Sequence, residues 1–133
     1  MSSIDTAVYT RLAACAGLTA LVSTRIYAHF TPQNATYPCV VHNQISGPRQ
    51  YVMGEQNPIV RARWQLDSYA ATSVAARAVS EQVRLALSNY HGTSDSVVID
   101  HVEQVNELSD YNESEELHRV IQDFMIDFRE TTP

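Results

Sequence analysis

The pattern of apolar and polar residues is clearest between Val60 and Tyr90. Residues 60–67 alternate strictly, as a strand buried on one side requires. One face carries Val60, Ala62, Trp64 and Leu66, and the other carries Arg61, Arg63, Gln65 and Asp67. After Thr72 or Ser73, which can cap a helix, apolar residues recur at three- and four-residue spacing. They are Ala76, Val79, Val83, Ala86, Leu87 and Tyr90. The sequence therefore predicts a strand with a charged outer face, followed by a long amphipathic helix that covers the sheet.

Weaker patterns precede this unit. We predict a first helix that starts at Ser2 or Ser3 and ends near Gly17, with a short second turn over residues 18–22. Its apolar stripe is Ile4, Val8, Leu12 and Cys15. Two strands are then expected, over residues 25–30 and 37–46, separated by a break at residues 31–34.

Two strands are also expected after the long helix. Residues 88–96 have loop composition, and residues 97–105 read as a strand with Val97, Ile99 and Val105 on one face. Residues 106–116 carry five carboxylates and no base, so we expect a solvated loop there. Residues 117–129 alternate as strongly as residues 60–67 and predict the last strand.

This order of elements predicts an α+β fold. We expect an antiparallel or mixed sheet of about four to five strands, with the two main helices packed on one face. The other face is then left for solvent or neighbours. A chain of 133 residues with 44% apolar content fits a single domain, 1–133, with a frayed tail at 130–133.

The segment 47–58, GPRQYVMGEQNP, is predicted to be a long hairpin loop. Loops of this length in small domains are usually functional or disordered. The apolar residues Tyr51, Val52 and Met53 at its tip favour a docking element. A hairpin tip without a role is the alternative.

The charge of the chain narrows the possible partners. Its formal net charge is −6, and all nine basic residues are arginine. Arginine suits bidentate contacts with carboxylates at interfaces, although genome composition explains the lack of lysine equally well. An acidic chain is a poor candidate for binding a phosphate backbone. Cys15 and Cys39 are expected to be buried free thiols of a soluble protein made in a reducing cytoplasm. No apolar run is long enough to span a membrane.

Candidate chemistry is sparse. None of the five histidines, at positions 29, 42, 91, 101 and 118, pairs with another ligand at a recognised metal-binding spacing. The sequence has no nucleophile elbow and no glycine-rich phosphate loop, and the acidic tract lacks the glycine and spacing of a calcium loop. We therefore expect neither catalysis nor a cofactor or metal.

Several segments, read in order, resemble the tail completion proteins of long-tailed bacteriophages, also called tail terminators or tail-to-head joining proteins. The matching segments are LVSTRIY at 21–27, Pro32, YPCVV at 37–41, RWQLDSY at 63–69, VRLAL at 83–87 and LHRVIQDF at 117–124. The resemblance covers about Leu12 to Phe128. It implies an α+β sheet with helices on one face and a virion structural protein without a catalytic centre.

The resemblance further implies a hexameric ring of this chain between the tail tube and the head connector. We expect contacts with both proteins in the virion, assembly in the host cytoplasm, and passage of DNA without specific binding. On this basis Arg61 and Arg63 are candidates to pair with carboxylates of a neighbour, and Tyr51 to Met53 to dock as an arm. Glu113, Glu115 and Glu116 are candidates to line the passage, where like charge discourages a polyanion from sticking. The alternatives are a head-side adaptor of the neck and a small ligand-binding domain or hydrolase.

Overall fold

The structure, a computed structural model, describes residues 4–28, 31, 36–46, 49–50, 59–94 and 97–130. The described helices are α1 (Ile4–Ala13), α2 (Ala16–Val22) and α3 (Ser73–Leu87). The described strands are β1 (Ile26–Ala28), β2 (Cys39–Ser46), β3 (Arg49–Gln50), β4 (Ile59–Ala70), β5 (Gly92–Ser94), β6 (Val97–Asn112) and β7 (Leu117–Glu130). Tyr51, Val52 and Met53, and residues 131–133 of the expected tail, lie outside the described residues.

The strands form one mixed sheet in the order β1-β2-β4-β7-β6-β5, and β3 pairs with β4 beside this path. The β1–β2 pair is parallel, and the other pairs are antiparallel. The predicted α+β fold with a mixed sheet is confirmed. The sheet has more strands than expected because the short strands β3 and β5 form within segments predicted to be loops, 47–58 and 88–96.

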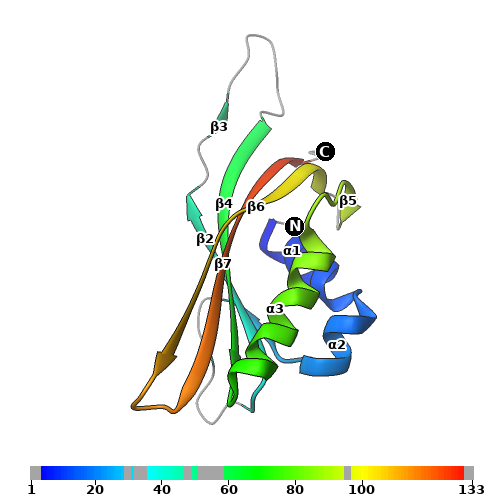
Figure 1. Ribbon diagram of the computed structural model, residues 1–133. Coiled ribbons are helices and arrows are strands. Elements are labelled where there is room, and N and C mark those ends of the chain that lie inside the picture. Colours follow the sequence, from blue (N-terminus) through cyan, green and yellow to red (C-terminus); the bar gives the residue numbers. More distant parts are fainter. Residues whose placement is uncertain are drawn as a thin grey trace.

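The helices lie together on one face of the sheet, and the other face is left uncovered by them (Figure 1). Helix α3 starts where Thr72 accepts a hydrogen bond from the Ala75 N–H, as its capping sequence predicts. Its apolar stripe packs on β4 and β7, where Trp64, Leu66, Phe124 and Ile126 are buried in the core. The first helical region is divided because Cys15 is in an extended conformation at the start of α2, so Gly17 lies within a helix rather than at its end.

The acidic tract is not the loop that its composition predicts. Strand β6 continues through it to Asn112 and pairs with β7 along its length, and only residues 113–116 form a turn. The prediction failed because residues 105–112 are exposed on both faces of this part of the sheet, so no alternation of apolar and polar residues marks the strand.

Irregularities in β6 also change which residues are buried. The register with β7 shifts between Ile99 and His101 and again between Gln104 and Asn106. Each bulge inserts one unpaired residue and reverses the faces that follow it. Val102 therefore enters the core, whereas Val105, predicted to share a face with Val97 and Ile99, is 44% exposed.

Candidate functional site

The face of the sheet opposite the helices carries ion pairs that cross from strand to strand. Arg61 contacts Asp127 of β7 at 3.3 Å and Glu103 of β6 at 3.2 Å. Arg63 contacts Asp123 of β7 at 2.8 Å. Both arginine side chains remain 43% exposed. The two candidate interface arginines thus lie on the outer face, as their alternation with buried residues predicts, and already have carboxylate partners within the chain.

A second group of charges lies where β4, β7 and β6 run side by side near the β6–β7 turn. The Arg119 guanidinium donates two hydrogen bonds to Asp110, at 3.1 and 2.6 Å, and lies 3.9 Å from an Asp67 oxygen. The hydrogen bond to Asp110 raises the pKa of Arg119 and lowers the pKa of Asp110. Arg119 is therefore a fixed cation that ties the hairpin of β6 and β7 to the centre of the sheet.

Asp67 is the most deeply placed carboxylate of this group, with only 4% of the residue exposed. Burial raises its pKa, whereas a hydrogen bond donated by Gln65 at 3.0 Å and the charge of Arg119 act in the opposite direction. Burial also raises the pKa of the neighbouring Tyr69 hydroxyl. The charged form of Asp67 therefore depends on Arg119 and Gln65 remaining in place.

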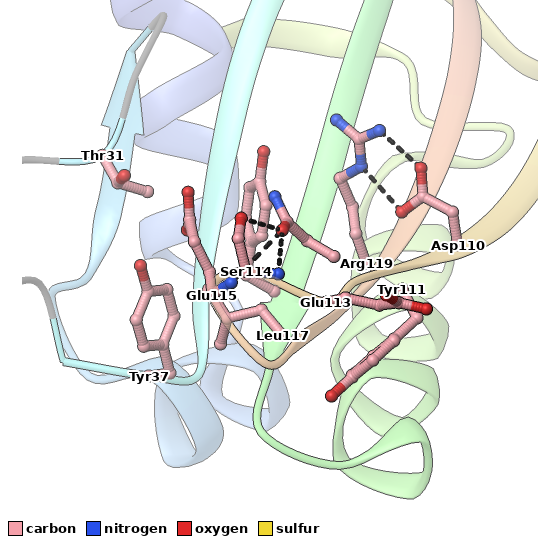
Figure 2. A pocket seen from close by; sticks show the side chains of 11 residues that line it. Thr31, Tyr37, Asp110, Tyr111, Glu113, Ser114, Glu115, Leu117 and Arg119 are labelled. Atoms are coloured by element: carbon pink, nitrogen blue, oxygen red, sulfur yellow. Dashed lines mark hydrogen bonds and ion pairs between the residues drawn. The ribbon is translucent and has the colours of Figure 1, made fainter.

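A hollow of about 550 Å³ opens beside this group (Figure 2). Tyr37, Tyr69 and Thr31 line it on one side, and Glu113 and Glu115 of the β6–β7 turn line it on another. The rings of Tyr37 and Tyr69 are 6.4 Å apart. None of its described lining residues is a histidine or cysteine. Its lining is aromatic and charged, and it includes Arg119 together with its partner Asp110.

The turn that closes this hollow holds the candidate acidic residues. Asn112 accepts hydrogen bonds from the Ser114 N–H at 3.0 Å and the Glu115 N–H at 3.2 Å, which fixes the turn. Glu113, Glu115 and Glu116 are all exposed there. They lie together as the sequence predicts, although at a hairpin tip rather than in a long loop.

The two cysteines and the described histidines have separate surroundings. Cys39 is buried, and burial raises the pKa of its thiol to about 11, whereas Cys15 is half-buried and both are free. His42 stacks on Trp64 with 6.2 Å between ring centroids, and His118 lies against Tyr111 at 4.6 Å. His29 lies outside the described residues. Within the described ranges, no three His, Cys, Asp or Glu side chains are grouped to hold a metal ion. No described helix has the length and apolarity that crossing a bilayer requires.

A comparison with known protein families shows which family the chain belongs to. A family described as tail completion protein gp17 matches residues 6–128. The chain belongs to this family. This tail completion family member is therefore a structural protein of a bacteriophage-type virion tail, as its sequence segments predicted.

A solved structure supports the fold of this tail completion protein. It is similar to a chain of the structure titled "Virion of native gene transfer agent (GTA) particle", with a TM-score of 0.76 and 18% sequence identity. The match covers 96% of this chain and 95% of that chain. At this identity the likeness supports the fold alone. No curated protein sequence matches the chain significantly.

The residues that sequence reasoning missed are the acidic partners of the outer-face arginines. Asp123 and Asp127 lie at outward-facing positions of β7, and Arg61 and Arg63 lie at outward-facing positions of β4. Cross-strand partners of opposite charge stabilise a sheet. Aligning the two strands so that their opposite charges face each other would therefore have identified Asp123 and Asp127.

Proposed function

We propose that the chain caps the tail tube and joins the tail to the head connector as a hexameric ring, working as a single domain over 1–133. The observation that carries this proposal is the family match, which spans nearly the whole chain, residues 6–128. The sheet face that the helices leave uncovered (Figure 1) is consistent with it, because Arg61, Arg63 and their carboxylate partners offer a charged surface to other proteins. Assembly in the host cytoplasm and a role without enzymatic activity belong to the same proposal.

Removing the chain tests this proposal directly. Cells that express the particle genes without this chain should accumulate DNA-filled heads and separate tails, and supplying the chain should restore joined particles. Electron microscopy with an antibody to the chain would locate it at the head-proximal end of detached tails. Label on heads instead would favour the alternative, a head-side adaptor, and joined particles in the absence of the chain would contradict both roles.

The outer-face arginines, Arg61 and Arg63, are proposed to contribute to contacts with neighbouring subunits or the tail tube. Their ion pairs within the chain do not bury them, since both side chains are 43% exposed. The side chains of Asp127 and Asp123 are only 24% and 12% exposed, so we expect the double variant Arg61→Gln/Arg63→Gln to lose about 1–3 kcal/mol of stability. A domain of about 5–15 kcal/mol still folds after such a loss. We expect the variant to yield at least about tenfold fewer joined particles. Circular dichroism and particle titre measure the two effects.

A control is available on the same sheet. Arg129→Gln removes a more exposed pair, Arg129 with Asp100 at 3.1 Å, in which the side chains are 46% and 38% exposed. Its particle titre should equal that of the wild type. A normal titre for the Arg61→Gln/Arg63→Gln variant would show that these arginines serve the monomer only.

Glu113, Glu115 and Glu116 are proposed to face the passage for DNA. Their exposure at the hairpin tip is consistent with this role, since like charge would keep the DNA from adhering. Replacing all three with glutamine should slow DNA exit from assembled particles in an ejection assay. Wild-type ejection kinetics would count against the role.

A further inference from the structure

Strand β6 leaves most of one backbone edge without a partner among the described strands. It runs for 16 residues from Val97 to Asn112, yet β5 covers only Val97–Ile99 on its outer side. Over the rest of its length β6 pairs with β7 alone. Every second residue of an antiparallel edge directs its N–H and C=O groups away from the sheet, so this edge can accept another strand.

Natural sheets usually protect such an edge with bulges and free charges. Here both bulges precede Asn106, and Asn106–Asn112 pair with β7 in unbroken register. The two acidic residues of this run are held by arginines on either face, Glu107 by Arg77 at 2.8 Å and Asp110 by Arg119 at 2.6 Å. The segment 106–112 is thus an unprotected edge on the order of 20 Å long.

Two large apolar side chains of the same segment are exposed, which favours contact with a partner. Leu108 is 56% exposed and Tyr111 is 48% exposed. A strand added at this edge would cover part of both side chains and satisfy the outward backbone groups at the same time. Addition of a strand to a free sheet edge is a common mode of protein recognition.

The partner can be inferred from the two ends of the sheet. If β6 paired with the β6 of another copy, the contact would close a two-fold dimer, whereas a ring needs two different surfaces. The opposite end of the sheet is β1, which pairs with β2 alone among the described strands. β1 is preceded by Arg25, whose guanidinium donates to uncharged acceptors, the carbonyl oxygens of Pro38 at 2.9 Å and Leu21 at 3.4 Å.

The two ends also differ in charge. The free edge of β6 ends at the turn that carries Glu113, Glu115 and Glu116, all exposed. No described carboxylate is paired with the Arg25 guanidinium at the β1 end. The exposed glutamates beside the β6 edge and the Arg25 guanidinium beside β1 carry opposite charges, which attract each other between copies.

We propose that residues 106–112 of β6 pair with the β1 end of the sheet in a neighbouring copy of this chain, so that the sheet continues from subunit to subunit. This inference depends on the proposed ring and specifies which strands form its contacts.

The test is photo-crosslinking in assembled particles. A benzoylphenylalanine is introduced in place of Leu108, and a control chain carries it in place of Leu85 of α3, which is 58% exposed. After irradiation of purified particles, mass spectrometry maps the crosslinked peptides. We expect position 108 to link to residues 25–28 or 39–46 of a second copy, and position 85 not to do so.

The other results each overturn the inference. A link from position 108 to the β6 of another copy would show two-fold pairing, a link to a different protein would show a different occupant, and no link would show a free edge. These results leave the proposed function standing as long as the chain is found in joined particles. Absence of the chain from the purified particles would instead contradict the proposed function. The presence of the chain is therefore checked before irradiation.

Discussion

Replacing Trp64 with alanine is expected to destabilise the protein by about 3–5 kcal/mol, the usual cost of deleting a large aromatic side chain from a core. Trp64 is fully buried, and its cross-strand neighbours are Gln44 of β2 and Phe124 of β7. A domain of ordinary stability has about 5–15 kcal/mol in total, so this change removes a large share of it. Urea denaturation followed by circular dichroism measures the loss.

A conservative variant separates the effect of volume from that of hydrogen bonding. The indole N–H of Trp64 is buried with no hydrogen-bond partner among the described atoms. Trp64→Phe therefore removes an unsatisfied donor along with part of the ring, and we expect it to cost no more than about 1–2 kcal/mol. If Trp64→Ala cost less than Trp64→Phe, β4 would not lie in the centre of the core as the structure shows.

The elements that could be predicted from the sequence are those with one buried and one exposed face. Residues 60–67 and 117–129 alternate because β4 and β7 lie in the middle of the sheet, with helices on one side only. Helix α3 has a continuous apolar stripe because it packs on those same strands. In these elements, buried and exposed positions recur with the period at which side chains change face, so burial is visible as a sequence pattern.

The end of β6 could not be predicted because its environment leaves no such pattern. Its residues after Gln104 are exposed on both faces, and what makes it a strand is backbone pairing with β7. The bulges before it depend on the register with a strand that comes later in the chain. An acidic tract in this setting is indistinguishable in composition from a loop.

The partners of the outer-face arginines were hidden for a different reason. Arg61 lies 66 residues from Asp127 and 42 from Glu103, and Arg63 lies 60 from Asp123. The sequence indicated that the arginines point outward, but only the order of strands shows that carboxylates lie beside them. Whether they also contact another subunit stays a prediction.

Replacing Arg119 with glutamine is expected to destabilise the protein by about 2 kcal/mol, between the values for exposed and for buried ion pairs. The change leaves Asp67, which is 4% exposed, without its nearest cation and releases Asp110 of the hairpin. We expect faster hydrogen exchange in residues 108–119 as well as a lower urea midpoint. Arg129→Gln, which removes an exposed pair, should change stability by less than about 1 kcal/mol.

A second substitution and a change of pH reveal whether charge causes this loss. Burial raises the pKa of Asp67 in the folded state, so the folded protein holds that proton more firmly than the unfolded chain, and the penalty for its charge appears as pH rises. Arg119 lowers the pKa of Asp110, a contribution that the wild type loses as pH falls. Both effects predict that the stability difference between wild type and Arg119→Gln narrows at acid pH.

Adding Asp67→Asn to Arg119→Gln should recover part of the stability at pH 7, because a neutral amide needs no cation and can still accept the hydrogen bond from Gln65. The double variant should then show less of the pH dependence than Arg119→Gln alone. A difference from the wild type that is independent of pH and is not rescued by Asp67→Asn would mean that Arg119 stabilises the hairpin through the packing of its aliphatic chain, with its charge contributing little.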